Sequence, residues 1–311
     1  MPLLECVPNV SEGRSHAVID RLARAARAPG VQLLDLSCDP DHNRSVLTLA
    51  GEPGALHAGL LRLYEAAIEA IDLGVQHGVH PRVGAVDVVP FVPLGEASMA
   101  DAVEAARALG RAVAERFALP VFLYEEAATR PHTRSLAEIR RGGLPRLAER
   151  LADPAWAPDF GPPRLDRRAG ATVVGARFFL LAFNAVLDTA EVGVARTIAR
   201  AVRESGGGLP ALRAIGVFLA SRGRAQVSMN LTDFRRTSLW AALEAVRAKA
   251  HALGARVVDT EIVGLVPEEA LSRALAEALG LADLAGDRSL ERRLALVQGG
   301  EQTTGEAVEG A

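Results

Sequence analysis

Two histidines, an arginine and an aspartate lie within twelve residues, in the segment Gln76–Asp87. Its two inner glycines free the backbone from helix and strand geometry. Pro81 restrains His80 towards extended conformations, because the proline ring clashes with a helical predecessor. The apolar run Ala85–Val92 then overlaps the end of the segment. A titratable imidazole on a stiff loop at the start of a buried strand is suited to general acid–base catalysis.

Two interpretations of His80 stay open from the local sequence: a general acid or base, or a loop histidine that hydrogen-bonds a neighbour. His77 lies three residues earlier, a spacing that also occurs in metal sites. No cysteine or glutamate nearby completes such a site. We therefore expect no bound metal.

Polar groups also gather in the turn Asp-Pro-Asp-His-Asn-Arg at residues 39–44. Asp39, Asn43 and Arg44 either contact a ligand or belong to a turn that caps itself through Asx hydrogen bonds. A second polar segment, Asn9–Gly13, lies between an expected strand and an expected helix. The helix N-terminus there either binds a carboxylate or is simply capped.

Arginine supplies almost all the basic charge, since Lys249 is the only lysine among 311 residues. Schiff-base chemistry is therefore not expected, and an anion would be bound by guanidinium groups, which bind carboxylates bidentately. Each candidate could equally be a surface charge; they are Arg82, Arg164, Arg167, Arg168 and Arg177. A formal net charge of −3 without a basic run argues against nucleic acid as a partner. The phosphate-binding pattern GxxxxGK and the GxSxG nucleophile pattern are both absent.

Cysteine content and hydropathy indicate the cellular setting. Cys6 and Cys38 are too few for a disulfide scaffold and lack the spacing of a zinc site. The N-terminus has no basic segment followed by an apolar core, and no uncharged apolar stretch is about 20 residues long. The sequence therefore predicts a cytoplasmic protein without a membrane span.

Helical and strand periodicities alternate in the same order twice along the chain. In the first half we expect strands at 3–10, 31–38, 44–51 and 86–92, and helices at 15–28 and 55–71. In the second half we expect strands at 178–187, 211–221, 224–234 and 255–263, and helices at 189–203, with Thr189 as N-cap, and 238–253. Both halves read βαββαβ. This order predicts an α/β (α+β) protein with two ferredoxin-like subdomains, whose sheets meet across a groove.

The remaining segments complete the predicted organisation. Residues 121–124 are expected to add a strand to the first half, and 155–163, with three prolines, to form a long ordered loop between domains. The small, polar residues 298–311 are expected to be disordered. The predicted division is an N-terminal subdomain at 1–177, a C-terminal subdomain at 178–285 and a partly disordered tail at 286–311.

Five motifs resemble the glutamate formiminotransferase family, which forms the transferase half of formiminotransferase-cyclodeaminase. They are LECVPNVSEG at 4–13, HPRVGAVDVVPFVP at 80–93, DPAWAPDFGP at 153–162, GATVVGAR at 170–177 and QVSMNL at 226–231. The resemblance runs in order from residue 3 to about residue 280, which is very specific. We expect no cyclodeaminase half.

The resemblance implies an activity and two sites. The family transfers a formimino group from N-formiminoglutamate to N5 of tetrahydrofolate, in histidine degradation. Folate lies between two α/β subdomains, and the transferase halves pair as dimers, so we expect a homodimer with tetrahydrofolate as co-substrate. The family's catalytic histidine stands in the His-Pro-Arg triplet, which is His80 here. Its folate-contacting loop follows the Trp-Ala-Pro-Asp-Phe motif, which implies contacts from Gly161, Pro162, Pro163, Arg164, Leu165, Asp166, Arg167, Arg168, Ala169 and Gly170.

The implied chemistry suits these residue types. N5 attacks the amidine carbon and loses a proton, and the glutamate nitrogen gains one on leaving, so one histidine between the two nitrogens serves both steps. Both substrates carry glutamate carboxylates, for which we expect Arg44, Arg82 and Arg177 as partners. Asp35 and Asp39 are expected to accept N–H bonds from the pterin or the amidine.

One segment departs from the family pattern. The family commonly has His-Lys/Arg-Gly-Glu before His-Pro-Arg, whereas this chain has Gln76-His77-Gly78-Val79. The lost charges leave two alternatives open: a related enzyme that acts on an N5-formyl group, and a folate-binding protein with little catalysis. The basic residues within 163–168 favour a polyglutamylated folate.

Overall fold

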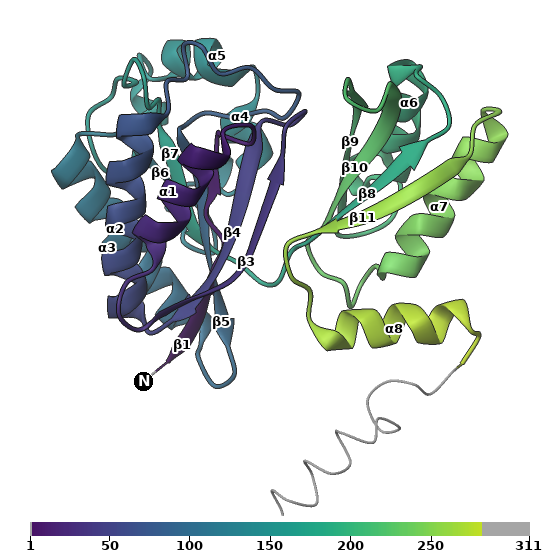
Figure 1. Cartoon of the computed structure of the whole chain (residues 1–311), viewed down its shortest axis with the longest axis horizontal. Coiled ribbons are helices and arrows are strands. Elements are labelled where there is room, and N and C mark those ends of the chain that lie inside the picture. Colours follow the sequence, from purple (N-terminus) through teal and green to yellow (C-terminus); the bar gives the residue numbers. More distant parts are fainter. Residues whose placement is uncertain (1, 282–311) are drawn as a thin grey trace, which may run out of the picture.

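Two β-sheets lie at the centre of the molecule, and most of their helices lie on the outer sides (Figure 1). The structure is a computed structural model that describes residues 2–281. The segment 286–311, predicted to be a partly disordered tail, lies outside the described residues. No helix within residues 2–281 combines the length and the apolar character needed to cross a membrane.

The first sheet has seven strands in the order β3-β4-β1/β2-β5-β7-β6. β1 and β2 occupy one position, since both pair antiparallel with β4 and β5. β7 pairs parallel with β5 and β6, so the sheet is mixed. The strands are β1 (Leu3–Cys6), β2 (Asn9–Val10), β3 (Val31–Asp39), β4 (Arg44–Gly51), β5 (Val86–Leu94), β6 (Val121–Glu125) and β7 (Thr172–Ala176).

Local sequence explains the helices that cover one face of this sheet, α1 (His16–Ala26), α2 (Pro53–Ala70) and α3 (Met99–Phe117). The side chain of Ser15 caps α1 by accepting from the Val18 amide. α2 begins at Pro53, and proline is well tolerated in the first turn of a helix. Ser98 and Asp101 form a reciprocal capping box at the start of α3. Leucine and alanine side chains of these helices pack on the sheet and form the larger core.

The second sheet repeats the order of the first four strand positions. Its strands β8 (Leu181–Leu187), β9 (Leu212–Leu219), β10 (Arg224–Leu231) and β11 (Val257–Val263) lie in the antiparallel order β11-β8-β10-β9. Helices α6 (Val192–Val202) and α7 (Leu239–Ala252) pack on one face, and α8 (Glu268–Ala278) contacts α7. The predicted fold class, two ferredoxin-like βαββαβ subdomains, is confirmed.

Three details differ from the sequence-based expectations. α6 begins at Val192 with Glu191 as N-cap, and Thr189 instead accepts a hydrogen bond from the Glu191 amide at 3.1 Å. Helices α3 and α8 and strand β7 are additional to the elements expected from the sequence. The 155–163 segment is not an interdomain loop: it starts in a 3₁₀ turn (Pro154–Trp156), and Phe160 pairs with Val121, within the first subdomain.

Short helices cover part of the other face of the first sheet. They are α4 (Leu136–Arg140) and α5 (Gly143–Arg150), preceded by a 3₁₀ turn at Pro131–Thr133. Ile139 and Leu147 from these helices pack on Phe122 and Val173 of the sheet in a second, smaller core. The rest of this face looks towards the helix-free face of the second sheet (Figure 1).

Candidate functional site

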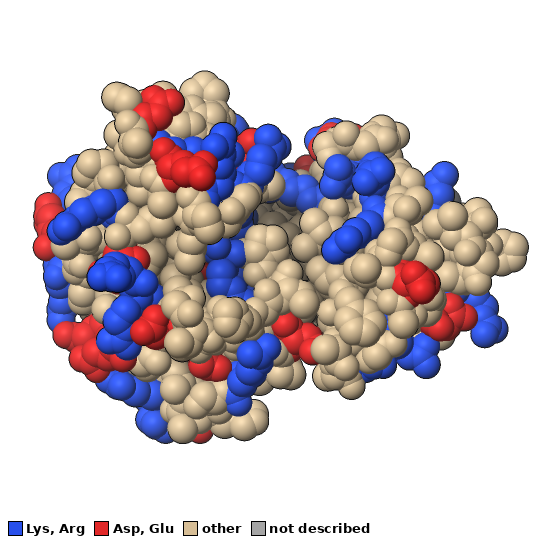
Figure 2. Space-filling model, turned by 90° about the horizontal axis from the view of Figure 1, so that it is seen from above, with Lys and Arg blue, Asp and Glu red and all other residues tan. Residues whose placement is uncertain are grey.

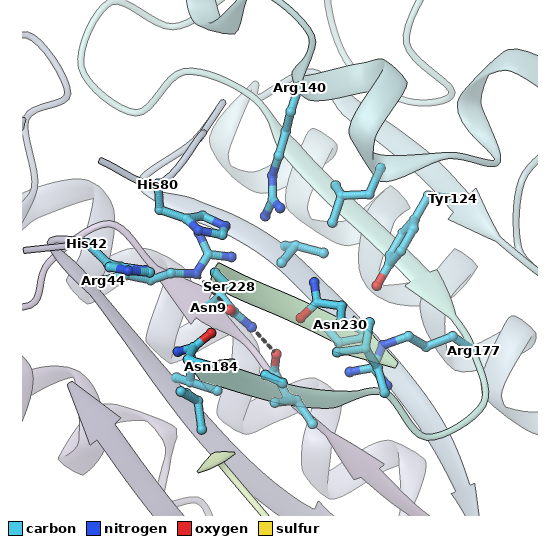
Figure 3. Close-up of a pocket in the computed structure, with 18 residues that line it drawn as sticks. Asn9, His42, Arg44, His80, Tyr124, Arg140, Arg177, Asn184, Ser228 and Asn230 are labelled. Atoms are coloured by element: carbon cyan, nitrogen blue, oxygen red, sulfur yellow. Dashed lines mark hydrogen bonds between the residues drawn. The ribbon is translucent and has the colours of Figure 1, made fainter. Parts of the chain in front are cut away.

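A cavity of about 140 Å³ lies between the two sheets, and residues of both subdomains line it. Figure 2 shows the hollow between the two halves, with basic side chains beside it. His42, Arg44 and His80 lie at one end of the cavity, and Tyr124 and Arg177 lie towards the other (Figure 3). The predicted groove between two sheets is therefore present, and three of the predicted site residues, His80, Arg44 and Arg177, line it.

Asp87 is the buried anion that holds the arginines of this cavity. Its side chain is fully buried, and its Oδ2 accepts from Arg44 at 2.8 Å and also from Arg140. Burial lowers the pKa of Arg44 to about 10, while Asp87 opposes that shift. Burial alone would raise the pKa of Asp87, but Arg140 and Arg44 hold it below its usual value. The three charges sum to one positive charge facing the cavity.

His80 stands beside this cluster and stacks on His42, with ring centroids 5.6 Å apart and planes 20° apart. Burial, and then the charges of Arg44 and Arg140, hold the pKa of His80 well below 6.5. His80 is therefore neutral at pH 7. Its Nδ1 and the Nε2 of His42 are buried and find no hydrogen-bond partner within residues 2–281. Both rings thus have polar atoms available to a bound ligand.

The loop that carries His80 is held by side chains from two other segments. Asn43 is fully buried, its Oδ1 accepts from the Gly13 amide at 2.9 Å, and its Nδ2 donates to Gln76 and to the His77 carbonyl. Gln76 also donates to Glu12 at 2.9 Å. Burial favours a higher pKa for Glu12, but hydrogen bonds from the Ser15 and Arg14 amides lower it. In these two polar segments, Glu12 and Asn43 cap backbone amides, whereas Asn9 and Arg44 line the cavity.

Arg82 and Asp39 hydrogen-bond the backbone of the turn that carries His42. Arg82 donates to the carbonyl oxygens of His42 at 2.7 Å and of Asn43 at 3.1 Å. Asp39 accepts from the amides of Asp41 and His42 at 2.8 and 2.7 Å, which is an Asx-type turn. Neither side chain lines the cavity, so each positions the His42 turn.

Two groups of expected ligand contacts lie away from the cavity lining. Asp35 lies on the edge strand β3, where Ser37 donates to it at 2.8 Å, beside a groove against α1. The 161–170 loop folds on the first subdomain: Arg168 pairs with Asp72, and Asp166 caps the Arg168 and Ala169 amides. The end of the loop pairs with the segment after His80, since the Ala85 amide donates to the Ala169 carbonyl at 2.9 Å. The loop therefore supports the His80 segment through its backbone.

Several lining residues were not singled out from the sequence. Arg140 reaches the cavity from α4, Tyr124 from β6, and His42 from the turn whose role was left open. Asn184, Ser228 and Asn230 come from β8 and β10 of the second sheet. The alternation of polar residues along β10 was the available signal, because it predicted a strand with one face that is not apolar. Nothing local distinguished Arg140 from other surface arginines.

The side chains in the described part of the chain do not form a metal-binding cluster. No group of three His, Cys, Asp or Glu side chains within residues 2–281 is arranged to hold a metal ion. His77 is exposed, whereas His80 is half-buried and faces the cavity. The site consists of imidazole, guanidinium, amide and hydroxyl groups, which can transfer protons and bind anions.

Comparison with known proteins agrees with this geometry. The model of the formiminotransferase domain, N-terminal subdomain, matches residues 3–177, and the formiminotransferase domain model matches residues 182–278. The chain is 43% identical to a glutamate formimidoyltransferase of Streptococcus pyogenes, over 86% of this chain and 90% of that protein. It is 41% identical to one of Thermoplasma acidophilum, over 94% and 98%. A formimidoyltransferase-cyclodeaminase of Sus scrofa is 44% identical over 88% of this chain and 52% of that protein. The two subdomains, the cavity between them and these matches show that the chain belongs to the formiminotransferase family.

Proposed function

We propose that this chain is a glutamate formimidoyltransferase that moves a formimino group from N-formiminoglutamate to N5 of tetrahydrofolate. One observation carries the proposal: the histidine of the His-Pro-Arg triplet faces a cavity between two subdomains, beside arginines. Formiminoglutamate carries two carboxylates, and folate ends in a glutamate. A cavity with Arg44, Arg140 and Arg177 on its walls matches two substrates that carry carboxylates.

His80 would act first as a base and then as an acid. Its lowered pKa keeps it neutral at pH 7, so it can take the proton that N5 loses as the new N5–carbon bond forms. The same proton then goes to the glutamate nitrogen as the old carbon–nitrogen bond breaks. The excess positive charge of Arg44, Arg140 and Asp87 would hold the anionic donor and disfavour protonation of His80 before the substrate arrives.

The test compares wild type with His80→Ala. We expect formimino transfer to fall by about two to four orders of magnitude, the usual contribution of a positioned acid–base group. Folate binding, measured by calorimetry, should stay within about threefold, because the arginines and the second sheet remain. Full transfer activity in His80→Ala would contradict the proposed role.

The two alternative functions are separated in the same assay. Turnover with N-formylglutamate and not with N-formiminoglutamate would identify a formyl transferase. Folate binding without turnover of either donor would identify a folate-binding protein. The two positions at which the family's charged pair is lost, His77 and Val79, do not line the cavity, which favours the formimino activity.

Three further features belong to this proposal. We take 1–177 and 178–285 as the two subdomains, consistent with the sheets they contain. Binding of folate by the 161–170 loop would occur outside the present cavity lining, and the basic residues there suit a polyglutamate tail. A homodimer in the cytoplasm is proposed from the family and from the two free cysteines, and light scattering on the purified protein tests the dimer.

A further inference from the structure

The two subdomains contribute chemically different walls to the cavity. Within the described chain, all charged or titratable lining side chains belong to residues 1–177, including the His42–Arg44–His80 group, Tyr124, Arg140 and Arg177. The second subdomain contributes only uncharged side chains: Leu180, Ala182, Asn184, Ser228, Asn230 and Val263. One wall therefore suits anions, and the other suits a neutral polar group.

A polar row runs across the second sheet on this uncharged wall. Asn184 of β8 lies directly between Ser228 of β10 and Glu261 of β11 in the strand registers. Neither the Ser228 hydroxyl nor the Asn230 amide forms a side-chain hydrogen bond to any other part of residues 2–281. By contrast, Asn9 on the opposite wall is already satisfied, because it donates to Val7 and accepts from Arg44.

Glu261 fixes which end of the Asn184 amide faces the cavity. Asn184 Nδ2 donates to Glu261 Oε1 at 2.8 Å. Gln226 Nε2 donates to the same oxygen at 3.0 Å. A carboxylate only accepts, so the amide nitrogen must face it and the amide oxygen is left to accept from another group. The Oε1 of Gln226, which is fully buried, likewise has no partner among the described residues.

We infer that this second-subdomain wall binds the neutral reduced pterin, with Asn184 Oδ1 accepting from the N–H edge of its planar pyrimidine ring. The inference rests on the proposed function and deepens it by assigning one substrate to each wall. Amide and hydroxyl groups match the alternating donors and acceptors of the ring. Glu261 is a positioning residue, since it acts through Asn184. The carboxylates of formiminoglutamate would then bind to the arginines of the opposite wall.

The experiment measures two affinities in Asn184→Leu. The probes are 5-formyltetrahydrofolate and N-formiminoglutamate, each titrated alone by calorimetry. We expect folate affinity to fall about tenfold or more, because an N–H donor would lose its buried acceptor. Formiminoglutamate affinity should stay within about twofold. Thr260→Val, an exposed neighbour of Glu261 on β11, is the matched control and should change neither.

Further variants keep the inference falsifiable if Asn184→Leu does not fold. Ser228→Ala and Glu261→Leu, which removes the acceptor that orients Asn184, should each weaken folate binding and leave formiminoglutamate binding unchanged. A folate analogue without the 2-amino group should lose affinity for wild type, and Asn184→Leu should no longer distinguish it from the parent compound. A loss of formiminoglutamate affinity instead, or unchanged folate affinity, would overturn the assignment.

Wild-type turnover separates this inference from the proposed function. If the variants show the predicted changes in affinity but wild type shows no formimino transfer, the proposed activity is wrong and the wall assignment stands. A second outcome is that wild type transfers the formimino group while Asn184→Leu weakens the binding of formiminoglutamate and leaves that of folate unchanged. In that case only the wall assignment is wrong. Absence of any folate binding would refute both.

Discussion

At the scale of single residues, the protonation state of His80 is set by what surrounds it. Burial, Arg44 and Arg140 all disfavour its charged form. The folded-state pKa therefore lies below the unfolded value, and the unfolded chain binds an extra proton between the two. His80 thus lowers the stability of the fold as the pH drops from about 6.5 towards the folded-state pKa. The same shift leaves a neutral base ready at pH 7.

Arg140→Gln is expected to move the acid limb of the pH–rate profile upwards. Removing one positive neighbour raises the pKa of His80 towards its ordinary value, because the charged imidazole is then less disfavoured. Activity at pH 6 should then fall relative to pH 8, whereas wild type keeps its rate at pH 6. The measurement is kcat/KM against pH, which reports the free enzyme. Arg134→Gln, an exposed arginine paired with Glu126, serves as the control. An unchanged acid limb in Arg140→Gln would mean that another group limits the rate.

At the scale of elements, the segment after His80 is positioned by backbone pairing. The Ala171 amide donates to the Val83 carbonyl at 2.8 Å, and Gly84 bridges Gly170. Ser11 adds a hydrogen bond to the Gly84 carbonyl at 2.7 Å. Three segments far apart in sequence therefore meet at Gly84 and fix where the His-Pro-Arg triplet leads into β5.

Gly84→Ala should disturb this junction. A Cβ at Gly84 would lie 1.8 Å from the Ala171 carbonyl oxygen, so the paired segments must move apart. We expect a loss of about 1–3 kcal/mol in the free energy of unfolding, measured by urea denaturation, together with a lower kcat. Gly54→Ala is the matched control, because its Cβ meets nothing within 4 Å, and it should not lower the stability. Wild-type stability in Gly84→Ala would show that the junction is more adaptable than its spacing indicates.

At the scale of the whole molecule, two polar contacts bridge the subdomains. Asp41 accepts from the amide of Ser221 at 3.1 Å and from its hydroxyl, and Glu125 accepts from Arg213 at 3.0 Å. They join the His42 turn to the β9–β10 hairpin, and the end of β6 to β9. The cavity of about 140 Å³ is smaller than the ~300–1,000 Å³ of typical ligand sites. We therefore expect the subdomains to separate and close again when two substrates bind.

Asp41→Ala should weaken the closed arrangement more than the fold. We expect the free energy of unfolding to change by about 1 kcal/mol or less, because the lost bonds are exposed. The KM of both substrates should rise while kcat changes little, since a smaller fraction of molecules is closed. Arg222→Ala is the control: it removes an ion pair with Asp259 inside the second subdomain. Equal KM values in Asp41→Ala and wild type would argue against closure through this contact.

The sequence by itself determined the repeated βαββαβ order and the polar alternation of β10. These features depend on periodicity and on neighbours in the chain, so local patterns are sufficient to predict them. The sequence also singled out His80 as a candidate catalytic residue, through the His-Pro-Arg triplet and the family resemblance.

Only the tertiary structure decided which polar residues share one cavity. In the folded chain, three of the expected ligand contacts, Asn43, Arg82 and Asp39, hydrogen-bond the segments that carry His42 and His80. Arg140, Tyr124 and Asn184 reach the cavity from elements up to about a hundred residues away from His80. Which face of each element meets another sheet depends on long-range packing, and burial and neighbouring charges at that meeting set the pKa of His80.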